Sequence, residues 1–286
     1  MTERSAGVCG AGLMGAGIAQ VLATAGYEVL LYDIDDRAAQ QALARIEADL
    51  DKGVARGKVE ESDRVAILSR ISLVADLAAF ADVDVLIEAI AETLAIKRDV
   101  FSQLDRICPP PALLLSNTST LSPSEIAEVM EHPERFAGLH FFNPAQRMKL
   151  VEILPGRSTS AETVSQVTML AGELGKTPVV ANEAPGGIVS RLQLLVRNEA
   201  IRLLAEGVAT ADDIDTAMKL GSGWPMGPME LSDLVGLDIH VNNSDSLADL
   251  LGNDAYRPDE YVRRLVADGQ LGRKSGRGFY EYQEDR

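Results

Sequence analysis

A histidine and a carboxylate in the segment 136–152 have the spacing of a general-base pair. The apolar run from Phe136 to His140 predicts a buried strand that ends on an imidazole, and Glu152 follows one short strand later. An imidazole held by a carboxylate is a base suited to work near neutral pH. Taken alone, His140 is better explained as a histidine satisfied in a core. The catalytic hypothesis therefore depends on the rest of the chain.

Three glycines near the N-terminus have the spacing of a dinucleotide-binding turn. They follow a short apolar strand and open an amphipathic helix, in the order Gly10, Gly12 and Gly15. Gly10 allows the tight turn, Gly12 lets backbone amides approach a pyrophosphate, and Gly15 lets helix and strand pack closely. Such a fingerprint is weak by itself and needs the right flanking elements.

The next apolar strand supplies that context. Residues 28–32 end at Asp33, about 20 residues beyond the glycines, where an acidic residue binds the adenosine ribose. A carboxylate there would repel a 2′-phosphate, so the sequence favours NAD over NADP. The alternative is an aspartate that only forms a turn or caps a helix.

Strands and helices alternate through most of the segment before Pro185. Further strands are expected at 83–90, 113–116, 136–140, 149–154 and 177–180, with helices within 38–69 and at 97–104. This alternation predicts an α/β fold with a doubly wound, mainly parallel sheet of the Rossmann type. Ligands then bind at the C-terminal ends of the strands.

Beyond Pro185 the periodicity becomes helical. Residues 188–206 have helical spacing of apolar residues, Gly207 ends the run, and Thr210 resembles the N-cap of a further helix. We therefore expect a Rossmann-type NAD-binding domain at 1–184 and an all-helical domain at 185–286.

Charge and composition limit the possible partners. The 286 residues carry a net charge of −16, which argues against nucleic acid and anionic membranes. Cys9 and Cys108 give neither a disulfide framework nor a metal-ligand spacing, and no metal site is expected. Without an apolar signal region or a membrane-length run, we expect a cytoplasmic protein.

Taken together, these segments resemble the 3-hydroxyacyl-CoA dehydrogenase family over nearly the whole chain. Besides the glycine fingerprint, the resemblance is carried by residues 88–92, 116–119, 138–144, 148–152, 225–228 and 272–280. It implies NAD-dependent, reversible oxidation of a 3-hydroxyacyl thioester in a homodimer joined through the helical domains. The helical domain at 185–286 would then serve in substrate binding and dimerisation.

The resemblance also implies roles for individual residues. His140 would take the proton of the 3-hydroxyl, Glu152 would orient its ring, and Ser119 would hydrogen-bond the reacting oxygen. The other expected site residues lie near the cofactor: Glu92, Lys97, Asn117 and Asn143. The alternatives are a solvated helix start for Glu92 and Lys97, and a turn for Asn117.

The departures from the family concern the substrate. Ser190 stands where the family usually has a catalytic Asn, Gly187 where it has Phe, and Arg147 is expected near the acyl group. A short or polar acyl group suits these changes better than a long alkyl chain. One alternative is a relative that oxidises glyceryl groups on acyl carrier proteins in polyketide extender-unit synthesis.

A role of another class is a non-catalytic NAD-binding or structural protein, such as the lens proteins that share this fold. The presence of Ser119, His140 and Glu152 argues against it, because packing alone needs none of them.

Overall fold

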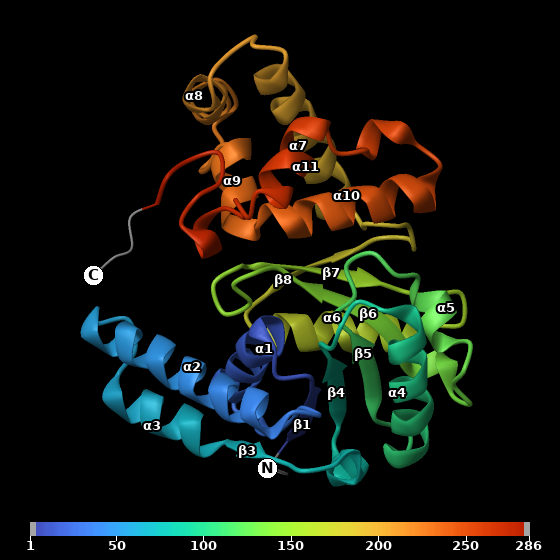
Figure 1. Ribbon diagram of the computed structural model, residues 1–286. Coiled ribbons are helices and arrows are strands. Elements are labelled where there is room, and N and C mark those ends of the chain that lie inside the picture. The colour runs from blue at the N-terminus through green and yellow to red at the C-terminus, as the bar shows by residue number, and fades with distance from the viewer. Residues whose placement is uncertain (1–3, 283–286) are drawn as a thin grey trace. The chain divides into compact units, whose positions relative to one another are not determined.

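The computed structural model describes residues 4–282, which form two compact units that meet between Gly187 and Ile188. The first unit is built on one eight-stranded sheet with the order β3-β2-β1-β4-β5-β6-β7-β8 (Figure 1). Its strands are β1 (Ser5–Cys9), β2 (Glu28–Tyr32), β3 (Ile71–Leu73), β4 (Val85–Glu88), β5 (Leu113–Ser116), β6 (Phe136–Phe141), β7 (Leu150–Leu154) and β8 (Thr177–Val180).

The sheet is parallel from β3 to β6, and β7 runs antiparallel to β6. The expected doubly wound α/β fold is confirmed. No strand was expected at β3, a three-residue strand in which Ile71 alone is buried. Antiparallel pairing of β6 and β7 places residues of the 136–152 segment directly opposite one another.

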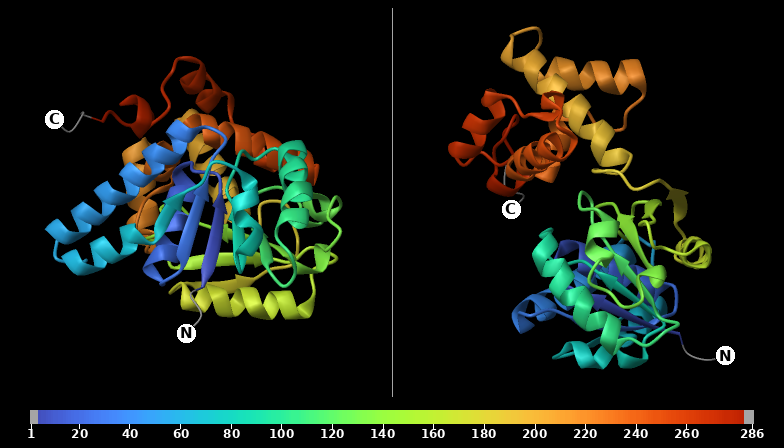
Figure 2. Two further views of the ribbon diagram at one scale, coloured as in Figure 1. Left: turned by 90° about the horizontal axis from the view of Figure 1, so that it is seen from below. Right: turned by 90° about the vertical axis from the view of Figure 1, so that its right-hand side faces the viewer.

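Helices cover both faces of the sheet (Figure 2). The helices are α1 (Leu13–Thr24), α2 (Asp36–Ala55), α3 (Glu61–Ser69), α4 (Leu94–Ile107), α5 (Pro123–Ala127) and α6 (Ala161–Glu173). Along β4, alternate side chains enter two cores, since Val85 and Ile87 pack with α1, α2 and α6, whereas Leu86 packs with α4 and α5. Short 3₁₀ turns lie at Leu77–Asp82 and Pro133–Arg135.

The second unit is helical, as expected. It comprises α7 (Val189–Ala205), α8 (Ala211–Ser222), α9 (Pro228–Val235), α10 (Leu237–Leu251) and α11 (Glu260–Ala267). The expected cap at Thr210 is confirmed, because its side chain accepts a hydrogen bond from the backbone N–H of Asp213. The division of the chain between 184 and 185 stays a prediction.

Two buried aspartates explain the motifs at 225–228 and 272–280. The Asp215 carboxylate accepts hydrogen bonds from the backbone of Met229 at 2.7 Å and the hydroxyl of Tyr280 at 2.8 Å. Asp233 accepts from the backbone N–H of Phe279 and Tyr280, each at 3.0 Å. These motifs therefore hold the helical unit together.

Among the described residues, no helix has both the length and the apolar character needed to cross a membrane.

Candidate functional site

His140 and Glu152 face each other across the antiparallel pair of β6 and β7. The register pairs the two residues directly, and His140 Nδ1 lies 3.1 Å from Glu152 Oε2. Both side chains are buried, with 6% and 0% of their surface exposed. A carboxylate accepts hydrogen bonds, so Nδ1 is the donor in this contact, and in a neutral imidazole Nε2 is then the acceptor. The geometry is that of a base oriented by a carboxylate, as the sequence led us to expect.

The strand that carries His140 is fixed by Asn117. Its Oδ1 accepts a hydrogen bond from the backbone N–H of Phe141 at 2.8 Å, and its own N–H donates to the carbonyl of Glu88 at 2.8 Å. Asn117 thereby ties the C-terminal ends of β4, β5 and β6 together. The ring of Phe142 packs 4.4 Å from the imidazole of His140, centroid to centroid.

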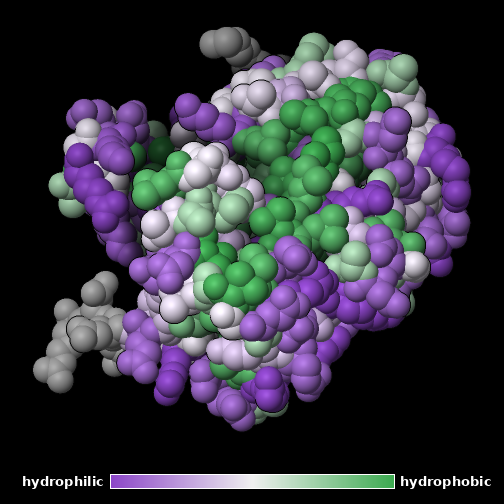
Figure 3. Space-filling view, turned by 90° about the horizontal axis from the view of Figure 1, so that it is seen from above, coloured by the Kyte–Doolittle hydropathy of each residue, from purple (hydrophilic) through white to green (hydrophobic). Residues whose placement is uncertain are grey.

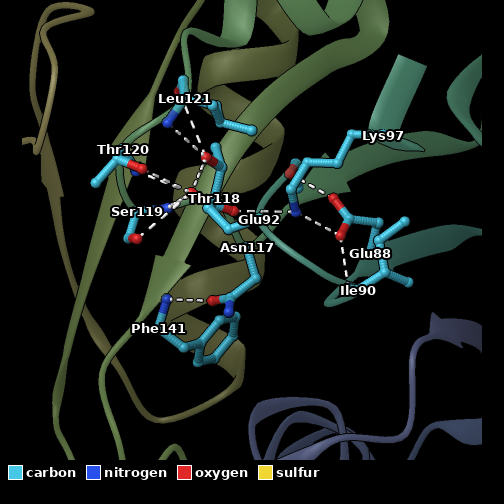
Figure 4. A network of polar contacts seen from close by, with 11 residues as sticks. Glu88, Ile90, Glu92, Lys97, Asn117, Thr118, Ser119, Thr120, Leu121 and Phe141 are labelled. Carbon is cyan, nitrogen blue, oxygen red and sulfur yellow. Dashed lines mark hydrogen bonds and ion pairs between the residues drawn. The ribbon is translucent and has the colours of Figure 1, made fainter. Parts of the chain in front are cut away.

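Lys97 lies between two carboxylates at the same end of the sheet (Figure 4). Its Nζ is 2.6 Å from Glu88 Oε1 and 3.3 Å from Glu92 Oε2, and the side chain is 1% exposed. The idea that Lys97 belongs to a solvated helix start is therefore wrong. Glu88 is also held by the hydroxyl of Ser116, which donates to Oε2 at 2.6 Å.

Glu92 organises the turn that carries Ser119. Its Oε1 accepts hydrogen bonds from the Thr118 hydroxyl at 2.7 Å and from the backbone of Ser119 and Thr120 at 2.8 and 2.9 Å. Burial alone would raise the pKa of Glu92, but the Lys97 ammonium and these hydrogen bonds outweigh it and lower the pKa to about 2. Glu92 is thus a fixed anion that shapes the loop after β5.

The three glycines of the turn differ in what an added side chain would meet at each position. Gly10 has a φ of +105°, and a Cβ there would lie 2.6 Å from the Ala89 carbonyl. A Cβ at Gly15 would collide with the carbonyl oxygen of Gly10, so helix and strand can approach only without it. Gly12 is the N-cap of α1, and a Cβ there would meet nothing within 4 Å.

Asp33 bridges the turn and the end of β2. Its Oδ2 accepts from the backbone N–H of Ala11 at 2.7 Å, and its Oδ1 from that of Asp35 at 3.0 Å. The Asp33 carboxylate therefore shapes the turn, which agrees with the alternative that this aspartate forms a turn. It also lies beside the glycines, as recognition of the ribose requires.

These residues fit NAD. The first N–H groups of α1 have no intrahelical partner, and the open space at Gly12 leaves them accessible to a pyrophosphate. The acidic Asp33 at the end of β2 suits a ribose with a free 2′-hydroxyl. Within residues 4–282, no group of three His, Cys, Asp or Glu residues could hold a metal ion.

Three further residues were expected at the site. Asn143 is exposed, with no side-chain hydrogen bond to the described residues, and its role near the nicotinamide stays a prediction. Ser190 is the second residue of α7, in the second unit, and its role stays a prediction. Arg147 forms an ion pair with Asp49 at 3.0 Å, and its place near the acyl group stays a prediction.

Arg147 lines a basic pocket of about 670 Å³ in the first unit. The other cationic side chains of the pocket are Lys52, Arg56, Lys58, Lys149 and Lys176. Of these, Lys176 is occupied by the carbonyls of Ala145 and Met148, at 2.6 and 2.8 Å. Within the part of the chain that the structure describes, the other four form no ion pair, which leaves them available to a polyanionic ligand.

Glu88 and the basic pocket were not singled out from the sequence as parts of the site. Glu88 ends the apolar strand β4, and a charged residue there is the signal that could have identified it. The pocket is lined by residues of α2 and of the loop before β7. These segments are distant in the sequence, so no local pattern predicts the pocket.

The chain matches known proteins along its whole length. The family model described as "3-hydroxyacyl-CoA dehydrogenase, NAD binding domain" matches residues 5–184, and the C-terminal domain of the same family matches residues 186–282. A probable 3-hydroxybutyryl-CoA dehydrogenase of Bacillus subtilis is 46% identical over 277 residues, covering 97% of this chain and 96% of the relative.

Solved structures agree with this assignment. FadB2 of M. tuberculosis has a TM-score of 0.95 at 38% identity, covering 99% of this chain and 100% of the neighbour. The (S)-3-hydroxybutyryl-CoA dehydrogenase of Ralstonia eutropha has a TM-score of 0.92 at 38% identity, with the same coverage. Together with the site geometry, these matches establish that the chain belongs to the 3-hydroxyacyl-CoA dehydrogenase family, whose members are NAD-dependent oxidoreductases.

Proposed function

We propose that this protein oxidises a short or polar 3-hydroxyacyl-CoA to the 3-oxoacyl-CoA with NAD, and runs the reverse reaction. The single observation that carries the proposal is the buried His140–Glu152 pair, 3.1 Å apart, on the sheet that also bears the glycine turn. A structural homologue that only binds NAD would have no use for a base held in this way.

Each residue of the pair has a distinct task. His140 takes the proton of the 3-hydroxyl at Nε2, and Glu152 stabilises the imidazolium that forms. NAD, when bound, would supply the acceptor for the hydride that leaves C3. Ser119, held by Glu92 at the end of β5, donates a hydrogen bond to the reacting oxygen. Lys97 and Asn117 keep Glu92 and the end of β6 in place beside the cofactor.

The basic pocket supports coenzyme A as the thioester carrier. Coenzyme A bears three phosphate groups on its nucleotide end, and a chain of net charge −16 gains from concentrating unpaired cations where they bind. A carrier protein brings one phosphodiester and a macromolecular surface instead. The glyceryl-carrier alternative therefore predicts that the pocket cations are dispensable.

A substrate panel tests the proposal. NADH absorbance is followed with 3-hydroxybutyryl-CoA, a longer 3-hydroxyacyl-CoA and a hydroxyacyl carrier protein. We expect turnover of the short CoA thioester, and Arg56→Glu should raise its KM by about tenfold, the equivalent of one lost charged contact. No NADH from any thioester despite NAD binding would support the non-catalytic alternative, and turnover of the carrier protein alone would support the carrier alternative.

Ser190 bears on the acyl group. If Ser190 adapts the site to a polar acyl group, Ser190→Asn should favour 3-hydroxybutyryl-CoA over a hydroxylated analogue by about tenfold in the ratio of kcat/KM. The ratio is the quantity to measure, because a general gain in activity cancels from it. An unchanged ratio would contradict the adaptation.

We also propose a cytoplasmic homodimer that associates through the helical unit. Figure 3 shows apolar side chains gathered in a band on one face of the molecule. Within the second unit, Leu192, Leu220 and Leu234 expose 60%, 83% and 45% of their surface. Sedimentation of the wild type should give twice the monomer mass, and Leu192→Asp should lower the dimer fraction.

A further inference from the structure

A glycine lies beside the catalytic carboxylate. Gly187 ends the first unit, and a Cβ built on it would lie 2.5 Å from Glu152 Oε2 and 3.3 Å from its Cδ. Oε2 is the same oxygen that meets His140 Nδ1 at 3.1 Å. Gly187 also has a φ of +52°, a conformation that favours glycine. A side chain at 187 would therefore overlap the place that Oε2 takes beside the imidazole.

The segment that carries Gly187 is itself anchored. The backbone N–H of Ala181 donates to the carbonyl of Ile153 at 3.0 Å, which extends the pairing with β7. The carboxylate of Glu183 accepts hydrogen bonds from the side chains of Ser122 and Ser124 and, at 2.9 Å, from the backbone N–H of Ser124. A turn then closes from the N–H of Gly187 to the carbonyl of Ala184 at 3.1 Å.

Because of these hydrogen bonds, a side chain at 187 would displace the Glu152 carboxylate more easily than the backbone of residues 181–187. The linker is tied at Ala181 and Glu183, so its backbone has little freedom to retreat from an added Cβ. The Glu152 carboxylate ends a side chain with rotatable bonds and is the easier group to displace. A shift of a few tenths of an ångström would stretch the 3.1 Å contact with His140 toward the limit of a hydrogen bond.

We propose that Gly187 is a positioning residue for the reaction, because the absence of a side chain there leaves Glu152 Oε2 its place against His140 Nδ1. It acts through Glu152 and does not itself touch the reacting atoms. This inference rests on the dehydrogenase function proposed above. It also assigns a physical consequence to the glycine in place of a bulky residue, since no larger side chain fits this backbone beside Glu152.

Gly187→Ala tests the proposal, with Gly207→Ala as the matched control. Gly207 also has a positive φ, +71°, but a Cβ there would meet nothing within 4 Å, so this control reports the backbone cost alone. We expect Gly187→Ala to lower kcat by about 10- to 100-fold while the Kd for NAD changes by less than about twofold. The control should keep wild-type kcat.

Proton NMR provides a readout that does not depend on activity. The chain has three histidines, so isotope labelling of histidine allows each Nδ1–H to be assigned. The His140 Nδ1–H signal, shifted downfield by the carboxylate, should move upfield or exchange away in Gly187→Ala and stay in place in Gly207→Ala. An unmoved signal with wild-type kcat would overturn the inference. A moved signal in a protein with no dehydrogenase activity would instead reject the proposed function alone.

A second variant covers the case in which Gly187→Ala does not fold. Glu152→Asp shortens the side chain by one methylene group and makes room for the Cβ at 187. In the double variant, kcat should exceed the product of the two single effects, because the two residues share one contact. If Gly187→Ala cannot be purified, recovery of folded protein in the double variant is the supporting result. Multiplicative effects, or no recovery, would overturn the inference.

Discussion

The charged side chains beside the site are paired with one another. Lys97 is satisfied by Glu88 and Glu92, and Glu92 in turn receives five hydrogen bonds from the loop at 118–120. Lys97 and Glu88 are buried, and removing one partner of such a pair leaves an uncompensated charge, which typically costs more than the intact pair contributes. We therefore regard this cluster as the support that keeps Ser119 and the end of β5 in place.

The lowered pKa of Glu92 predicts a pH dependence of stability. Its folded-state pKa of about 2 lies below the ordinary value of 4.5, so the anion stabilises the folded protein above pH 4.5. This contribution is lost as the pH falls from 4.5 toward about 2. Because 33% of the Glu92 side chain is exposed, solvent screening reduces the size of this contribution to stability. The prediction is therefore the direction of the change: Glu92 stabilises the folded protein less as the pH falls.

Urea unfolding of the wild type and Glu92→Gln at several pH values measures this effect. The difference in unfolding free energy between the two proteins should be largest at neutral pH and should shrink below pH 4.5. A difference that stays constant from neutral to acid pH would contradict the role of the charge. Glu128→Gln, on an exposed ion pair with Arg98, serves as the control.

At the scale of elements, two glycines of the turn between β1 and α1 have different roles. Gly15 is needed for packing, and Gly12 for binding of the cofactor. Gly15→Ala places a Cβ against the Gly10 carbonyl and should destabilise the protein by about 1 to 3 kcal/mol. Gly12→Ser meets open space and should change stability by less than about 0.5 kcal/mol, yet weaken NAD by about tenfold through blocked approach of the pyrophosphate. Thermal unfolding and NAD titration check both, and equal losses of stability would contradict this division.

Most of the fold could be predicted because its strands are apolar runs ended by glycine or polar residues. β3 could not be predicted, because a three-residue strand with one buried side chain shows no alternation of apolar and polar residues. The local sequence does not reveal that β7 runs antiparallel to β6, although this pairing is what brings Glu152 opposite His140. The ion pair between Arg147 and Asp49 on α2 could not be predicted, because it is a tertiary contact between distant segments.

For the whole molecule, the net charge of −16 contrasts with the cations of the basic pocket. Exposed cations are screened by salt, and raising the ionic strength from about 0.1 M to about 1 M shortens the Debye length from about 10 Å to about 3 Å. The KM for 3-hydroxybutyryl-CoA should therefore rise with salt, while that of a truncated pantetheine thioester without the nucleotide should not. A parallel response of both substrates would contradict binding of coenzyme A phosphates in this pocket.

The central claim is that His140, oriented by Glu152, is the base of an NAD-dependent 3-hydroxyacyl-CoA dehydrogenase. The most direct test compares kcat/KM for 3-hydroxybutyryl-CoA in the wild type and His140→Gln, together with the Kd for NAD. We expect kcat/KM to fall by about 10² to 10⁴, the usual contribution of a general base, with NAD affinity unchanged within about twofold. Near-normal turnover in the variant would contradict the mechanism.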